Sequence, residues 1–362
     1  MKKIICLICI LCMALLCTAC GNETVGEGGK EIVFQFNDEN IYLDEVFIYA
    51  MTTKEEYERE YGENIWGKTI VTDDGIETDV EEMAKKEVIS NIVTNKVLIA
   101  HAADYGISLS VEEENEADSK AEEFYQNLTE DQLSEMHFND RETIKKVLKE
   151  NALADKVYAR VMKDNTSEVS DEQARMTTFY DLFFECYYED EFGNIVPYSD
   201  DQVATQKKNA DSTYKTITED SNRNGVNIAF FASNYDLKYA GSHTMSSQEI
   251  EDTYGEDVKN TLYDMQNGDV SKVIKLDDGY HIFQMTALTD EEATAQNKDQ
   301  MNRKANQEYF DNIVSGWIEK LDPGYTYSKR VNMDVYNKIW LYTDTKRVSM
   351  DMYNQIEFKD RV

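Results

Sequence analysis

Hydrophobic residues recur at helical spacing through the first half of the chain. Between residues 80 and 105 they return every three or four positions, which is the pattern of an amphipathic helix. The same spacing is found in residues 41–61 and 140–162. Ser110 is a predicted helix N-cap, because a glutamate stands at the capping-box position three residues later. We therefore predict that residues 31–165 form a helical domain.

The pattern then changes to that of a mixed domain. Residues 179–184 are aromatic and β-prone, and helices are predicted at 201–218 and 246–265. Two apolar stretches within 273–285 flank an Asp-Asp-Gly turn, which is typical of a hairpin. A strand, helices and a terminal hairpin in this order predict an α+β domain over residues 172–288.

The C-terminal region, residues 289–362, starts with a polar helix that is predicted to end near residue 321. Residues 329–339 are then repeated, with substitutions, as residues 346–356. The repeat is too short for a solenoid, and we expect each copy to form a strand followed by a turn. We expect the whole region to pack back on the helical domain.

The N-terminus has the layout of a secretory signal, with two lysines, an apolar run over residues 4–16 and small residues before Cys20. The apolar run is shorter than the roughly 20 residues that a membrane-spanning helix needs. Thr18-Ala19-Cys20 resembles a lipobox. We therefore predict a signal peptide over 1–19, lipid on Cys20 and a flexible tether over 20–30; an ordinary cleavage site or a short anchor helix is the alternative.

Charge and cysteine content exclude several classes of function. The chain has 37 basic and 71 acidic residues, so nucleic acid is not an expected partner and anionic lipid would be repelled. Attachment to the membrane must therefore come from acyl chains. With Cys20 acylated, Cys186 has no partner for a disulfide or a two-cysteine metal site. No phosphate loop, nucleophile motif or metal-ligand spacing is present, so no cofactor and no metal are predicted.

Two segments of the chain resemble known foldases. Residues 265–274, followed by Gly279-Tyr280-His281-Ile282, resemble the end of parvulin-type prolyl isomerase domains. The helical region, with residues 96–110, resembles the chaperone part of PrsA- and SurA-like foldases. The resemblance implies an α+β protein in which a helical, SurA N-terminal-like chaperone domain carries an inserted or following parvulin-like domain.

The same resemblance assigns roles to individual residues. His281 matches the histidine at the end of the last strand, beside the isomerase pocket. Asp236 matches the acidic or thiol group of the second strand. Met245 matches the apolar wall around the proline ring, and Ile250 stands near the bulky residue that completes it. Met245 and Ile250 are equally suited to the ordinary hydrophobic core, and His281 to a structural hydrogen bond.

One position departs from the parvulin pattern. Parvulins usually carry a histidine on the first strand, and here either Tyr180 or Asp181 replaces it. Sequence alone does not choose between them, because a shift of one residue reverses the faces of a strand. Half of the usual polar cluster is therefore altered.

These observations predict a lipid-anchored foldase at the outer face of the bacterial cytoplasmic membrane. It would bind unfolded or newly exported polypeptides and isomerise their prolyl bonds. The first alternative is a catalytically inactive parvulin-fold chaperone or holdase. The second is a solute-binding lipoprotein, which would need two α/β lobes that the strand and helix order does not provide.

Overall fold

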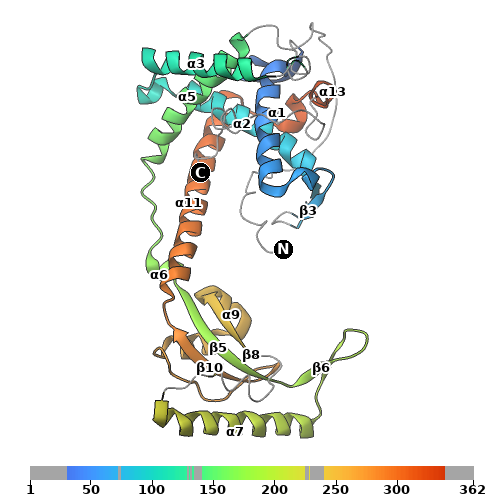
Figure 1. The fold of residues 1–362 in the computed structure, drawn as a ribbon, viewed down its shortest axis with the longest axis vertical. Coiled ribbons are helices and arrows are strands. Elements are labelled where there is room, and N and C mark those ends of the chain that lie inside the picture. The colour runs from blue at the N-terminus through green and yellow to red at the C-terminus, as the bar shows by residue number, and fades with distance from the viewer. Residues whose placement is uncertain are drawn as a thin grey trace. The chain divides into compact units, whose positions relative to one another are not determined.

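The computed structural model describes residues 31–71, 75–128, 130, 133, 141–224, 228 and 240–338 (Figure 1). The chain forms two compact units. The first, here called the helical unit, consists of the residues up to 166 together with those from 306 onward. The second, the sheet unit, consists of residues 167–305 and is inserted into the first. The predicted signal peptide, the tether and Asp236 lie outside the described residues.

The elements of the helical unit follow the periodicity of the sequence. They are β1 (Ile32–Phe36), β2 (Glu39–Tyr42), α1 (Leu43–Tyr61), the 3₁₀ helix η2 (Glu63–Ile65), β3 (Thr69–Val71), β4 (Glu77–Asp79), α2 (Val80–Ala100), the 3₁₀ helix η3 (Ala103–Tyr105), α3 (Val111–Asn127), α5 (Glu142–Met162), the C-terminal part of α11 (Glu291–Leu321), α12 (Tyr327–Arg330) and α13 (Met333–Tyr336). None of the described helices is both long and apolar enough to span a membrane.

Helix α2 is the predicted amphipathic helix and lies at the centre of this unit, in contact with α1 and α5. Val88 and Ile92, one turn apart, are fully buried on its apolar face. The predicted start of α3 is confirmed. The Ser110 hydroxyl accepts from the Glu113 amide at 3.2 Å, and the Glu113 carboxylate accepts from the Ser110 amide at 2.7 Å.

The two ends of the described chain meet in the helical unit. The Asn332 amide donates to the Val33 carbonyl at 2.7 Å, and the buried Tyr336 hydroxyl donates to the Lys85 carbonyl at 2.6 Å. The first copy of the repeat forms α12 and α13, so the strand-plus-turn prediction is wrong for it. The physical reason is local, because the Asn332 side chain accepts from the Val335 amide and starts a helical turn. The second copy lies outside the described residues.

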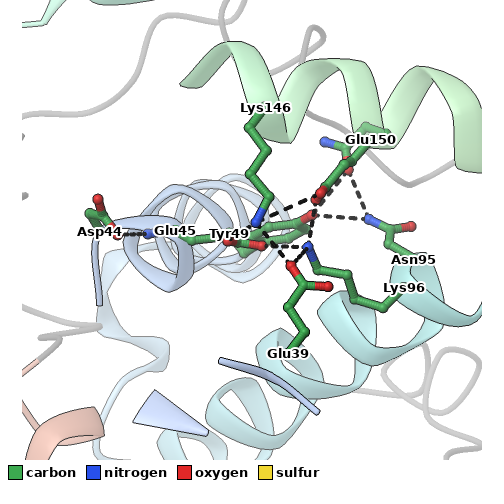
Figure 2. Close-up of polar contacts among 9 residues, drawn as sticks. Glu39, Asp44, Glu45, Tyr49, Asn95, Lys96, Lys146 and Glu150 are labelled. Atoms are coloured by element: carbon green, nitrogen blue, oxygen red, sulfur yellow. Dashed lines mark hydrogen bonds and ion pairs between the residues drawn. The ribbon is translucent and has the colours of Figure 1, made fainter. Parts of the chain in front are cut away.

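A buried ion network joins four elements of the helical unit (Figure 2). Lys96 of α2 lies 2.8 Å from Glu150 of α5, 3.1 Å from Glu45 of α1 and 3.0 Å from Glu39 of β2. Lys146 of α5 pairs with the same three carboxylates from the more exposed side. Burial lowers the pKa of Lys96, but the three glutamates outweigh it and raise that pKa above its ordinary value. Lys96 therefore stays charged inside the unit.

The sheet unit is built on one antiparallel sheet in the order β8-β5-β10-β9. Its elements are α6 (Asp171–Ala174), β5 (Met176–Glu185), β6 (Tyr187–Glu189), β7 (Ile195–Pro197), α7 (Asp200–Asn224), β8 (Ala240–Ser246), α9 (Ser247–Tyr254), α10 (Glu256–Tyr263), β9 (Ile274–Lys275), β10 (Gly279–Ala287) and the N-terminal part of α11. The predicted strand, the helix near 201–218 and the terminal hairpin are all present. The helix predicted at 246–265 is divided at Gly255, whose φ of 88° is not helical.

Helices cover both faces of this sheet (Figure 1). One face packs on α7, where Leu182 and Ile282 share a core with Ile217. The opposite face packs on α9 and α10, where Phe179 and Phe283 share a core with Leu262. Because side chains alternate along a strand, each residue of β5 and β10 is committed to one of these two faces. The predicted fold class, a helical domain carrying an inserted α+β domain, is confirmed.

Candidate functional site

Strand alternation places Asp181 and His281 on the same face of the sheet. In the antiparallel pair of β5 and β10, His281 lies opposite Phe183 and Phe283 lies opposite Asp181. This face is the one that α9 and α10 cover. Tyr180 points to the other face and packs against the core beneath α7. Of the two residues that the sequence left open, the structure therefore brings Asp181, and not Tyr180, to His281.

Two carboxylates hold the His281 ring. Its Nδ1 lies 2.9 Å from Asp181 Oδ2, and its Nε2 lies 3.1 Å from Asp278 Oδ1 in the turn before β10. His281 is 2% exposed and Asp181 is 4% exposed, whereas the Asp278 side chain is about half exposed. The three residues thus form a polar row from the interior to the surface of the sheet unit. A buried histidine with a partner on each nitrogen has a fixed ring orientation.

Aromatic rings surround this row. The His281 ring stacks on Phe183 with 4.6 Å between centroids and lies parallel to the ring of Phe283 at 5.6 Å. Tyr254, the last residue of α9, meets His281 edge-on at 6.0 Å. Its hydroxyl is also hydrogen-bonded to the Asp181 carboxylate. The rings exclude water from the Asp181–His281 pair, which strengthens the electrostatic attraction between them.

The surroundings of His281 and Tyr254 raise the pKa of both side chains. Burial opposes a charge on His281, but the hydrogen bonds and charges of Asp181 and Asp278 outweigh burial and raise the pKa of the imidazole above its ordinary value. Burial, and then the neighbouring Asp181 charge, raise the pKa of the Tyr254 hydroxyl well above its ordinary range. The two aspartates therefore favour the protonated form of the His281 ring, and burial favours the neutral form of the Tyr254 hydroxyl.

The other residues suggested by the sequence lie in different surroundings. Met245 is partly buried on β8 and packs against the same core as Phe283. Ile250 is fully buried in that core, so it has no surface to offer to a bound chain, and the core alternative describes it. Asp236 lies outside the described residues. The structure therefore brings together Asp181 and His281 and leaves Ile250 away from any exposed surface.

Sequence reasoning missed three residues of this site. Phe183 and Asp278 could have been found, since Phe183 shares the face of Asp181 two residues along β5 and Asp278 lies in the predicted turn. No sequence pattern distinguishes Tyr254 from the other tyrosines, of which the chain has 23 in all. Its position depends on the break at Gly255, which ends α9 with the ring over the sheet.

The raised pKa of His281 predicts a specific pH dependence. The stabilisation from the Asp181–His281 pair is fully present below about pH 6.5, the ordinary pKa of histidine, and is lost as the pH rises through the folded-state value. In an NMR titration, we expect the His281 ring to titrate above pH 6.5 and Asp181→Asn to lower its midpoint. Asp278→Asn, at the exposed end of the row, should have a smaller effect. A midpoint at or below about pH 6.5 in the unmodified chain would contradict the assignment.

Comparisons with known proteins give the site a context. Residues 199–299 match the family model of the PPIC-type PPIase domain. The chain is 23% identical to the foldase protein PrsA of Clostridium botulinum strain Langeland, over 91% of this chain and 98% of that protein.

Solved structures of PrsA from two bacilli also match. The structure from Bacillus subtilis matches with 15% identity and a TM-score of 0.21. This match covers 86% of the present chain and 98% of the Bacillus subtilis chain. The structure from Bacillus cereus is described as a peptidylprolyl isomerase and matches with 15% identity and a TM-score of 0.26. This match covers 74% of the present chain and 95% of the Bacillus cereus chain. Residues 199–299 thus match a PPIC-type PPIase domain and the chain as a whole is similar to PrsA foldases, which agrees with the resemblance seen in its sequence.

Proposed function

We propose that this chain is a membrane-anchored, extracytoplasmic foldase that isomerises prolyl bonds and binds unfolded, newly exported polypeptides. The observation that carries the proposal is the buried Asp181–His281 pair. It lies on the two central strands of the sheet unit, and residues 199–299 of that unit, which include His281 but not Asp181, match the PPIC-type PPIase family. An aspartate stands where parvulins usually have a histidine. The similarity to PrsA foldases over 91% of the chain supports the extracytoplasmic role.

The chemistry requires no bond to a substrate atom. Rotation about a prolyl peptide bond crosses a barrier of about 18–20 kcal/mol, and the twisted amide is less polar than the planar one. Apolar surroundings and hydrogen bonds that favour the twisted form lower this barrier. Tyr254, Phe183 and Met245 supply partly exposed apolar surface on this side of the sheet. His281 is 2% exposed, so its role in this proposal is to position Asp181 and Asp278 rather than to touch the substrate.

The anchoring part of the proposal rests on the N-terminal sequence. The lipobox-like Thr18-Ala19-Cys20 and the polar tether that follows support acylation of Cys20. Membrane fractionation tests it: a Cys20→Ser chain that stays in the membrane as tightly as the unmodified one would exclude lipid attachment at this position.

The proposed catalysis is tested with residues 21–362 and a client protein whose refolding is limited by prolyl isomerisation. We expect His281→Ala to lower the acceleration of refolding at least about tenfold, since it leaves Asp181 buried without its partner. His101→Ala, which removes a partly buried histidine of the helical unit, is the control and should retain acceleration. Equal acceleration in all three chains would exclude this site as the source.

A non-catalytic chaperone is the second candidate, and one observation favours it. The His281 ring is enclosed by Phe183, Phe283 and Tyr254, and Asp181 is nearly as buried. Such a pair also serves as a structural core interaction. Suppression of client aggregation without any acceleration of prolyl-limited refolding would identify this second function.

A further inference from the structure

The β6–β7 hairpin of the sheet unit exposes large apolar side chains to solvent. Phe192 is 83% exposed, Ile195 is 62% exposed and Tyr188 is 47% exposed. The hairpin extends away from the four-stranded sheet (Figure 1). Ile195 is paired with Glu189 and Tyr188 with Val196, so Ile195 and Tyr188 lie on opposite faces of the hairpin, and the tip itself carries Phe192 and Ile195. Exposed apolar side chains of this size commonly mark an interaction surface. Packing within the sheet unit does not require Phe192, because the side chain is almost wholly exposed.

The turn of this hairpin is ordered by its own hydrogen bonds. The Asp190 carboxylate accepts from the Phe192 amide at 2.9 Å and from the Asn194 amide at 2.8 Å. The Asp190 amide donates to the Asn194 carbonyl at 2.9 Å, and Gly193 takes the positive φ of 80° that the turn needs. The backbone at Phe192 is thus held before any partner arrives, which reduces the entropy lost on binding.

The base of the hairpin is attached to the candidate site. The Cys186 amide donates to the Asp278 carbonyl at 2.8 Å, and the Tyr198 amide donates to the Cys186 carbonyl at 2.8 Å. Asp278 is the residue whose carboxylate meets His281 Nε2. The ring of Phe183, which stacks on His281, lies 6.3 Å from that of Tyr187 in β6. The hairpin therefore leaves the sheet next to the candidate site, so a polypeptide of sufficient length can contact both.

Charge identifies the kind of partner. Residues 176–206, which include the hairpin, contain seven acidic residues and no lysine or arginine. Glu189 and Glu191 flank Asp190 in the turn itself. Two copies of this hairpin would bring like charges together, and anionic lipid would be repelled for the same reason. An extended polypeptide with both apolar and basic residues complements the surface.

We propose that the tip of the β6–β7 hairpin is a binding site for unfolded polypeptide segments that combine apolar and basic side chains. Phe192 and Ile195 contact the apolar side chains, and the surrounding carboxylates attract the basic ones, among them Glu189, which is paired with Ile195 across the hairpin. The site selects which segments are presented to the Asp181–His281 region. This inference rests on the proposed foldase function and defines its substrate class.

The test measures binding of a fluorescein-labelled, unstructured 15-residue peptide of alternating leucine and lysine around one Ala-Pro bond. Residues 21–362 are titrated and anisotropy is recorded. We expect Phe192→Ser/Ile195→Ser to weaken binding at least tenfold. The matched control is Val71→Ser/Ile76→Ser, because these side chains are 70% and 55% exposed near the β3–β4 hairpin of the helical unit. This control should bind as the unmodified chain does.

A second variant tests the charges. Glu189→Gln/Glu191→Gln should weaken binding and reduce its salt dependence, and a peptide with glutamate in place of lysine should bind at least tenfold more weakly. Unchanged binding in the Phe192→Ser/Ile195→Ser chain, or an equal loss in the Val71→Ser/Ile76→Ser control, would overturn the proposal. So would equal affinity for the lysine and glutamate peptides.

A short substrate separates this proposal from the proposed catalysis. A four-residue Ala-Pro peptide is too short to extend from the site to the hairpin tip. If both proposals hold, Phe192→Ser/Ile195→Ser isomerises the four-residue peptide at the unmodified rate while binding of the long peptide falls. Isomerisation that is absent from every chain, with long-peptide binding still dependent on Phe192, would reject the catalysis and keep the binding site.

Discussion

Replacing Lys96 with methionine is expected to destabilise the helical unit by about 3–5 kcal/mol. Lys96 is the buried lysine that pairs with Glu45 and Glu150, and its side chain is 6% exposed (Figure 2). Without it, the buried Glu45 and the partly buried Glu150 are left with the more exposed Lys146, and the Glu45 side chain is 3% exposed. A buried charge that loses its partner costs far more than the pair contributed, since it cannot be hydrated.

Tryptophan fluorescence during urea unfolding reports on this unit alone. All three tryptophans lie outside residues 167–305, and the described ones, Trp66 and Trp317, belong to the helical unit. Lys86→Met is the matched control, because Lys86 is exposed on the same helix. It should change the midpoint little. A Lys96→Met midpoint equal to that of Lys86→Met would show that the network does not hold α1, α2 and α5 together.

Gly279→Ala is expected to destabilise the sheet unit by about 2–4 kcal/mol. An alanine Cβ at this position would lie 2.2 Å from the Phe184 carbonyl oxygen and 2.8 Å from the Phe183 ring. Gly279 begins the central strand β10 and pairs with Glu185, so the clash falls on backbone that the sheet holds in place. The two strands must separate locally, which displaces Phe183 from the His281 ring.

Cys186 provides the readout for the sheet unit. In residues 21–362 it is the single cysteine, and it is 7% exposed beside this clash. The expected loss of stability corresponds to thiol labelling that is about 30 to 1,000 times faster, if labelling follows opening of the unit. Gly241→Ala in β8 of the same sheet is the control, because its Cβ would lie no closer than 3.6 Å to any atom. Labelling at the same rate in both variants would contradict the packing described here.

The elements that the sequence predicts well are those with strong local signals. Helix α2 has apolar residues at three- and four-residue spacings, and α3 starts at a side-chain cap that uses residues only three apart. The β9–β10 hairpin is defined by its Asp-Asp-Gly turn, where the Leu276 amide donates to the Gly279 carbonyl. Each of these signals depends on neighbours in the chain, so none requires knowledge of the tertiary structure.

The features that the sequence did not predict depend on distant contacts or on a single residue. Whether Tyr180 or Asp181 faces His281 follows from the pairing of β5 with β10, which are about 100 residues apart. The ion network draws Glu39, Lys96 and Glu150 from three elements, and no local pattern shows that they converge. Gly255 alone divides a helix that the hydrophobic pattern makes continuous. The strand expected in the first copy of the tail repeat is replaced by a helical turn that the Asn332 side chain caps.

The site itself was predicted in part. The match to the parvulin hairpin located His281 correctly on the last strand of the sheet unit, and the structure supplied its partners Asp181 and Asp278. Of the two readings of Ile250, substrate wall or ordinary core, its complete burial favours the core. Asp181 in place of the usual histidine keeps a polar group beside His281, but it exchanges a neutral or cationic ring for an anion.

The most direct test of the foldase proposal is NMR exchange spectroscopy on a short Xaa-Pro peptide with residues 21–362 present. We predict exchange cross-peaks between the cis and trans forms in the presence of the unmodified chain, on a timescale far below the tens of seconds of uncatalysed isomerisation. The cross-peaks should be lost with Asp181→Leu and retained with His101→Ala, a change in the helical unit. Cross-peaks that are absent with the unmodified chain, or that persist unchanged with Asp181→Leu, would contradict catalysis by the Asp181–His281 site.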